Sequence, residues 1–181
     1  MAINKGFLTC DTSEKGDEVF TPFYAVDPII KYIPLGSTIW LPFDENWSSF
    51  NQMLREKGFN VINSNLRGGQ DFFKYQPENY DIIISNPPFS KKDEVIKRLY
   101  ELNKPFAILL PMNSLQGKKR FKYFKKGIQI LCFDSRVDYH TNENYKTYTK
   151  GNHFGSAYFC KDFLPKDLIM EELIKYERPL K

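Results

Sequence analysis

The amino-acid sequence predicts an α/β fold with a mostly parallel sheet, helices on both faces and an antiparallel edge strand. Short apolar runs alternate with segments of helical periodicity, which is the order found in a parallel sheet with crossover helices. Two late apolar runs follow one another without a helix between them, which favours an antiparallel strand there. The length of 181 residues is that of one domain.

The elements are expected in a regular order along the chain. Residues 1–19 are polar and show no periodicity, so we expect a flexible N-terminal arm. A helix should begin at Thr21-Pro22, because threonine caps helices and proline suits the first helical position. This helix should end near residue 32. The following elements are expected as a strand at 38–43, a helix at 47–57, strands at 59–62 and 81–85, a helix at 93–102, a strand at 105–110, a helix at 115–126 and a strand at 128–133.

The C-terminal part of the chain begins with the expected antiparallel strand at 154–159, which follows a long polar connection. A short helix over 165–176 is expected to finish the fold. The sequence therefore divides into an arm at 1–19, a folded domain at 20–164 and a C-terminal helix or tail at 165–181.

Composition excludes several classes of protein. The chain is 41% hydrophobic and 27% charged, which indicates a folded protein and not a disordered one. No apolar run approaches the roughly 20 residues of a membrane helix, so we expect a soluble, cytoplasmic protein without a membrane partner. Its 3 cysteines and 2 histidines show no metal-ligand spacing, so no metal is expected.

The most informative motif is Asn86-Pro87-Pro88-Phe89, directly after the predicted strand at 81–85. Ligands of open α/β sheets lie beyond the carboxyl ends of the strands, so this turn is a candidate site. The Asn86 side-chain oxygen and an adjacent backbone carbonyl can accept both hydrogens of an amino group, and proline stiffens the turn that presents them. Phe89 offers a ring on which a flipped base can stack.

The segment 81–89 resembles the catalytic motif of the amino-methyltransferases, class-I Rossmann-like enzymes that methylate N6 of adenine, N4 of cytosine or amide nitrogens. The phenylalanine at its fourth position is similar to the N6-adenine branch. The resemblance implies S-adenosylmethionine as methyl donor, an amine held by Asn86 and Pro87 within the Pro87-Pro88 turn, a base stacked on Phe89, and no separate general base.

Further segments resemble this family in the expected order. Phe20-Thr21-Pro22 is similar to the element that encloses the methionine part of the donor. Asp71-Phe72 is similar to the segment whose aspartate accepts a hydrogen bond from the donor's adenine. Arg136, followed by 154–159, is similar to the late hairpin of phage-type adenine methyltransferases.

The first strand departs from the family pattern, because the turn after it contains no glycine. A glycine-rich turn normally lets the donor lie against the backbone. Asp44 or Glu45 can face the positive charges of the donor, or instead stabilise the start of the following helix. After the second strand, 63–65 holds only asparagine and serine where the family has a ribose-binding acid.

The expected partner is nucleic acid, with DNA favoured over RNA. Although the net charge is only +4, basic residues gather after the candidate turn and in a later run. The residues expected to contact phosphates are Lys91, Lys92, Lys118, Lys119, Arg120 and Arg136. The leading hypothesis is a phage-like or prophage-like N6-adenine methyltransferase. The alternative is an inactive methyltransferase-like protein that binds nucleic acid or a protein partner, and a purely structural domain is a third reading.

Overall fold

The computed structural model describes residues 19–141 and 154–179, which form one seven-stranded sheet. The strand order is β2-β1-β3-β4-β6-β5-β7. The strands are β1 (Thr38–Leu41), β2 (Asn60–Asn63), β3 (Ile82–Ser85), β4 (Phe106–Pro111), β5 (Gln129–Phe133), β6 (Ser156–Lys161) and β7 (Leu168–Glu171). The expected arm at 1–19 lies almost wholly outside the described residues.

Only β6 runs against the other strands in this sheet. It pairs antiparallel with β4 and with β5, whereas β1 pairs parallel with β2 and β3, and β3 with β4. The mostly parallel sheet and the late antiparallel strand are therefore confirmed. β5 and β7 complete the sheet beyond β6.

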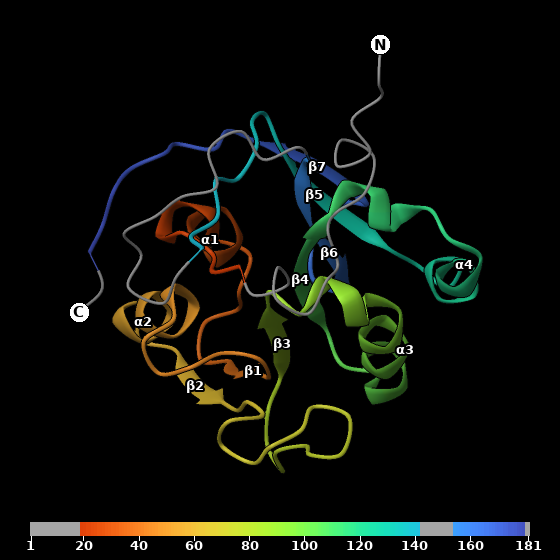
Figure 1. Cartoon of the computed structure of the whole chain (residues 1–181), viewed down its shortest axis with the longest axis horizontal. Coiled ribbons are helices and arrows are strands. Elements are labelled where there is room, and N and C mark those ends of the chain that lie inside the picture. Colours follow the sequence, from red (N-terminus) through yellow and green to blue (C-terminus); the bar gives the residue numbers. More distant parts are fainter. Residues whose placement is uncertain (1–18, 142–153, 180–181) are drawn as a thin grey trace.

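Helices lie on both sides of the sheet, as predicted. Helices α1 and α2 lie on one side, and α3 and α4 on the other (Figure 1). The bounds are α1 (Phe23–Ile30), α2 (Ser49–Glu56), α3 (Lys92–Leu102) and α4 (Lys118–Phe124), with short 3₁₀ turns η2 (Phe89–Lys91) and η3 (Met112–Leu115). Each predicted helix up to residue 126 is present, although several are shorter than expected.

Helix ends explain part of this shortening. α1 begins at Phe23 with Pro22 as its cap residue, so the predicted Thr21 cap is one residue too early. In α2 the Ser48 side chain accepts a hydrogen bond from the backbone N–H of Asn51 at 3.1 Å, which fixes the start of this helix. The helix predicted to end at residue 57 ends at Glu56, and Gly58 has a positive φ of 84° directly after this last turn.

The predicted helix over 165–176 is wrong. Residues Leu168–Glu171 form β7, which pairs parallel with β5 from Ile130 to Phe133. Their exposure alternates between exposed and half-buried, which is the period of a strand. β5 offers unpaired backbone groups on this side of the sheet, and pairing with them outweighs the weak helical pattern.

The core lies between the sheet and its helices. Strand β4 is buried along its whole length, as is expected of an inner strand covered on both faces. Trp40 of β1 is fully buried and donates its indole N–H to Ser64 Oγ at 2.8 Å. This core holds the carboxyl ends of β1 and β3 in fixed positions. None of the helices within 19–141 and 154–179 is long and apolar enough to cross a membrane.

Candidate active site

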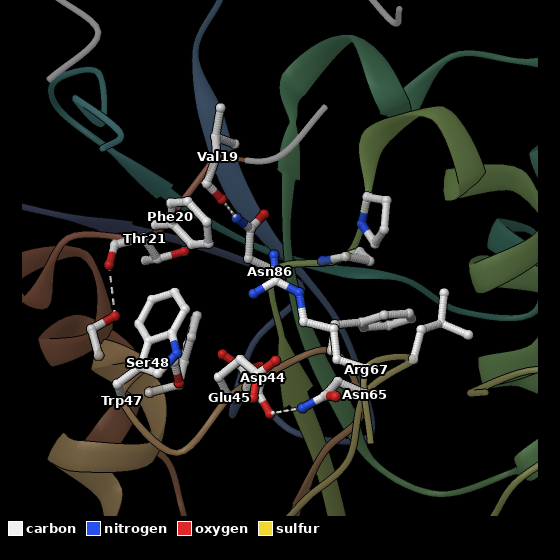
Figure 2. Close-up of a pocket in the computed structure, with 16 residues that line it drawn as sticks. Val19, Phe20, Thr21, Asp44, Glu45, Trp47, Ser48, Asn65, Arg67 and Asn86 are labelled. Atoms are coloured by element: carbon white, nitrogen blue, oxygen red, sulfur yellow. Dashed lines mark hydrogen bonds between the residues drawn. The ribbon is translucent and has the colours of Figure 1, made fainter. Parts of the chain in front are cut away.

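A pocket opens where the strand order reverses between β1 and β3. The chain leaves β1 for β2 on one side and then returns to β3 on the other side. Ligands of open α/β sheets bind at such a switch point, beyond the carboxyl ends of the strands. Residues from four segments line the pocket, as Figure 2 shows: 19–21, 43–45 with 47–50, 65–67 and 86–88.

Asp44 lies at the base of this pocket, just after β1. Its side chain is buried and accepts a hydrogen bond from Ser85 Oγ of β3 at 2.5 Å. Burial raises the pKa of the Asp44 carboxyl to about 6, although hydrogen bonds from Ser85 and Ser48 act in the opposite direction. The pKa of this pocket carboxyl is therefore close to neutral pH, so a small change in pH alters its charge.

Side chains organise the glycine-free turn after β1. Asn51 Nδ2 donates to the carbonyl of Asn46 at 2.5 Å, and Asn63 Nδ2 donates to Asn46 Oδ1 at 2.9 Å. Ser49 Oγ donates to the Thr21 carbonyl at 2.6 Å, which joins this turn to the segment before α1. The turn thus leaves a pocket open without glycine, and Phe43 and Trp47 contribute aromatic walls to it.

The segment after β2 holds no acid, and its polar side chains contact the protein. Ser64 accepts from Trp40, while Asn65 Nδ2 donates to the Asp44 carbonyl at 3.3 Å. Asn65 Oδ1 accepts from the backbone N–H of Gly68 at 2.7 Å. The charged side chain that this loop brings to the pocket is Arg67, which points into it in Figure 2.

Asn86 stands on the opposite wall of the pocket, at the end of β3. Its Nδ2 donates to the carbonyl oxygen of Val19 at 3.1 Å (Figure 2). Its Oδ1 is buried, and no donor among the described residues reaches this oxygen. A buried acceptor without a donor is costly, so it marks a place where a ligand N–H can bind. Pro87 and Pro88 line the same wall.

Phe89 does not line the pocket. Its ring is buried and packs edge to face against Phe154, with centroids 5.8 Å apart, and against Tyr139 at 6.1 Å. The Tyr139 hydroxyl donates to Ser156 Oγ at 2.9 Å. A base that stacks on Phe89 would therefore have to displace one of these rings.

The predicted donor-binding residues separate into two groups. Phe20 and Thr21 line the pocket beside Trp47, whose ring lies 5.2 Å from that of Phe20. Pro22 follows them and precedes α1. The backbone of Phe20 is fixed by an antiparallel bridge to His140, with both hydrogen bonds 2.9 Å long.

Asp71 and Phe72 do not reach the pocket. Asp71 Oδ1 accepts from the backbone N–H of Phe73 at 3.0 Å, so this carboxylate stabilises its own turn. Phe72 is buried, and its ring lies 5.4 Å from Trp40 and 4.9 Å from Phe43. A role for these two residues toward the donor stays a prediction.

The prediction that Arg120 binds phosphate is corrected by its position in the structure. It is buried, and its Nε donates to the Ser114 carbonyl at 2.7 Å. Its two terminal nitrogens donate to Asp93 of α3 and to the Gln116 carbonyl. Its guanidinium thus links α4 to α3 inside the protein, which contradicts a role in binding phosphate.

The other predicted basic residues remain at the surface. Lys91, Lys118, Lys119 and Arg136 are exposed, and Lys92 is half-buried with its Nζ donating to the Phe89 carbonyl at 3.1 Å. Because η2 follows β3 and α4 follows β4, these lysines lie at the same edge of the sheet as the pocket. Their contact with nucleic acid stays a prediction.

Several pocket residues have no signal in the sequence. Val19 acts through its backbone carbonyl, so its side chain carries no information about the contact. Trp47 and Ser48 lie at the predicted start of a helix, which gives no sign of a place in the pocket. Arg67 lies in a loop whose glycines predict a turn and nothing more. Within residues 19–141 and 154–179, no three histidines, cysteines or acids come together as a metal site.

The fold and the pocket at its switch point define an α/β protein of the class I methyltransferase type. A similar solved structure is that of a Listeria monocytogenes protein assigned as a class I S-adenosylmethionine-dependent methyltransferase. The identity is 15% with a TM-score of 0.51, covering 85% of this chain and 65% of that one. This likeness establishes the fold, and the chain spans less than two thirds of the matched structure.

The particular family follows from the sequence. The family model for the adenine-specific methyltransferase EcoRI matches residues 56–158, more than half of the chain, so the protein belongs to this family. The match includes β3 and the turn at 86–89 but not the opposite pocket wall at 19–50. A search of curated proteins gives no match.

Proposed function

We propose that this protein transfers a methyl group from S-adenosylmethionine to the N6 amino group of adenine in DNA. The observation that carries the proposal is the buried Oδ1 of Asn86, an acceptor on the pocket wall that no described donor satisfies. The membership of an adenine-specific methyltransferase family supports adenine as the target base.

The Asn86 turn suits an aromatic amine. The N6 lone pair of adenine is delocalised into the ring, so the amine is a weak nucleophile. Asn86 Oδ1 and the Pro87 carbonyl can each accept one N–H, which holds the nitrogen with one face toward the donor. Bond formation between N6 and the methyl carbon accompanies cleavage of the carbon–sulfur bond, and N6 then releases one proton.

The opposite wall suits a cationic methyl donor. S-adenosylmethionine supplies an electrophilic methyl group activated by a sulfonium. Asp44 provides a buried negative charge that hydroxyl groups stabilise, and Glu45 adds a second acid to the wall. Phe43 and Trp47 offer apolar surface to the uncharged parts of the donor. The residues present therefore fit this donor despite the glycine-free turn.

Asn86→Ala tests the proposal directly. Loss of the acceptor should lower the rate of methyl transfer to DNA at least about 100-fold, because the amine is no longer oriented. Donor affinity and the thermal unfolding temperature should stay close to those of the wild type. The measurement is incorporation of labelled methyl groups into adenine, with calorimetry for donor binding.

Asn79→Ala is the matched control, since this asparagine is exposed and lies outside the pocket lining. It should retain the wild-type rate. Full activity of Asn86→Ala would overturn the assignment of the amine site.

A binding protein without turnover is the second candidate. The observation that favours it is that Phe89, the ring expected to stack on the base, is covered by Tyr139 and Phe154. Calorimetry with S-adenosylmethionine separates the two functions. Binding below millimolar concentration supports the enzyme, whereas no heat at millimolar donor, together with retained DNA binding, supports the second candidate.

A further inference from the structure

We propose that the backbone carbonyl of Val19 is a positioning group that sets the orientation of the Asn86 amide and thereby selects a 6-amino base over a 6-keto base. This inference rests on the proposed function, because it concerns how the same turn recognises its target. The segment before α1 thereby takes part in base recognition together with the motif at 86–89.

The first step is the direction of the hydrogen bond between the two residues. Asn86 Nδ2 lies 3.1 Å from the Val19 carbonyl oxygen. A carbonyl can only accept, so the amide nitrogen has to face Val19 and the amide oxygen has to face away from it. The opposite orientation would bring two oxygens together and lose the bond.

The second step is the position of the Val19 carbonyl itself. The next residue, Phe20, exchanges two backbone hydrogen bonds with His140, and both are 2.9 Å long. The Phe20 ring also packs against Trp47, with centroids 5.2 Å apart. The peptide that carries the Val19 carbonyl is thus held from two directions, so it is a fixed reference for the Asn86 amide.

The third step is the consequence for recognition. An unconstrained asparagine presents an acceptor or a donor with similar ease, because rotation of the amide by a half-turn exchanges them. With its nitrogen bound to Val19, Asn86 presents Oδ1, which is buried and without a described donor. This oxygen binds the N–H of a 6-amino group and repels the oxygen of a 6-keto group. Val19 therefore contributes to specificity through Asn86.

The first experiment replaces the amide between Val19 and Phe20 by an ester, using an α-hydroxy acid in place of Phe20. An ester carbonyl is a weaker acceptor, so the Asn86 amide is held less firmly. The probe is a DNA duplex that the wild type methylates, carrying either adenine or hypoxanthine at the target position. The preference for adenine, measured as the ratio of dissociation constants, should fall roughly three- to tenfold.

The control is the same ester chemistry at His140. That ester removes one hydrogen bond of the bridge to Phe20 but leaves the Val19 carbonyl an amide. Each ester removes one N–H of this bridge, but only the Phe20 ester also weakens the Val19 carbonyl as an acceptor, so the His140 ester should lose clearly less of the adenine preference. Equal losses in both ester variants, or no loss in either, would overturn the proposal. Failure of the wild type to methylate adenine would instead refute the proposed function.

A second variant, Asn86→Asp, tests the same contact by its pH dependence. An ionised carboxylate cannot donate to Val19, whereas a protonated one donates its O–H to Val19 and keeps an oxygen for the amine. At saturating donor, the ratio of the variant rate to the wild-type rate should rise as the pH falls. A ratio that is flat with pH, or that falls, would contradict the role of Val19.

Discussion

The buried charge of Asp44 lowers the stability of the protein, whereas the same charge is proposed to bind the cationic donor. Its carboxyl is buried, and burial raises its pKa from 3.8 to about 6 in the folded protein. At a pH below both values the group is protonated in the folded and unfolded states, so it carries no charge penalty. As the pH rises from 3.8 to about 6, the carboxyl loses its proton in the unfolded state but keeps it in the folded protein, so the free energy of unfolding decreases until the buried group also ionises.

We therefore predict that Asp44→Asn changes stability and donor binding in opposite directions. Relative to the wild type, its free energy of unfolding should increase by up to about 3 kcal/mol as the pH rises from about 4 to about 7. Its affinity for S-adenosylmethionine should be lower above about pH 6, because the negative charge is gone. Urea unfolding and calorimetry over this pH range measure the two effects.

Ser85→Ala provides an independent check of this pKa. The Ser85 hydroxyl donates to Asp44 and opposes the rise of its pKa, so removal of the hydroxyl should raise the pKa further. The loss of donor affinity on acidification should then begin at a higher pH than in the wild type. A donor affinity that does not vary with pH in either protein would contradict a role for the Asp44 charge.

At the level of single residues, the sequence predicts the position of Asn86 at the pocket better than the positions of the expected donor-binding residues. Asn86 stands in a tetrapeptide whose chemistry can be reasoned from its side chains, and the structure places it on the pocket wall. Val19 contributes a backbone carbonyl, which every amino acid possesses, so no pattern identifies it. Asp71 was assigned by resemblance, but its carboxylate closes a local turn.

Arg120 is a structural element of the α3–α4 pair. It donates hydrogen bonds to Asp93 and to the carbonyls of Ser114 and Gln116, which precede α4. A Cβ atom on Gly117 would lie 2.5 Å from its Nη2, so the chain leaves space for the guanidinium at this glycine. The sequence does not predict this role, because nothing in the basic run 118–126 distinguishes the buried Arg120 from the exposed lysines around it.

Arg120→Ala should lower the free energy of unfolding by about 2–4 kcal/mol, since it leaves Asp93 and two carbonyls without their donor. Arg120→Lys should recover little of this loss, because one ammonium cannot replace the planar fork. Lys119→Ala, an exposed neighbour on the same helix, should stay within about 0.5 kcal/mol of the wild type. A small effect of Arg120→Ala in chemical denaturation would contradict this account.

The elements that the sequence predicts correctly are those with strong local patterns. β3 and β4 are continuous apolar runs, and α2 has a serine cap and a glycine terminus. β7 was predicted as a helix because a short apolar segment fits either period. Its structure is decided by pairing with β5 on the side that faces away from β6. This partner is distant in sequence, because Ile130 lies 38 residues before its partner Leu168.

For DNA binding by the whole molecule, the positions of the basic residues matter more than the net charge of +4. Lys118 and Lys119 are exposed at the start of α4, which follows the carboxyl end of β4. The pocket opens at this same edge of the sheet. Lys125 and Lys126 are also exposed but follow the other end of α4, so two similar charge pairs sit at opposite ends of one helix.

If the pocket edge binds DNA, the two pairs should differ. Replacement of Lys118 and Lys119 by glutamine should weaken DNA binding and reduce the slope of log K against log salt by about 2. The same replacement of Lys125 and Lys126 should leave the slope unchanged. Fluorescence anisotropy at several salt concentrations measures both slopes, and equal slopes in the two variants would contradict the proposed DNA-binding edge.

The segment after β7 returns across the molecule to the helices beside the pocket (Figure 1). Tyr176 donates its hydroxyl to Asp27 of α1 at 2.5 Å. Arg178 contacts both carboxylate oxygens of Glu56 at the end of α2, at 2.5 and 2.7 Å, and lies 4.6 Å from the centre of the Phe23 ring.

These contacts join residues 149 and 122 positions apart in sequence. On the ribosome, α1 and α2 emerge long before Tyr176 and Arg178 are made, so they cannot complete their packing during most of synthesis. Closure of so long a loop is also entropically slow. The pocket wall at 19–50 should therefore be among the last parts of the protein to become protected, although it is synthesised before β2 to β7.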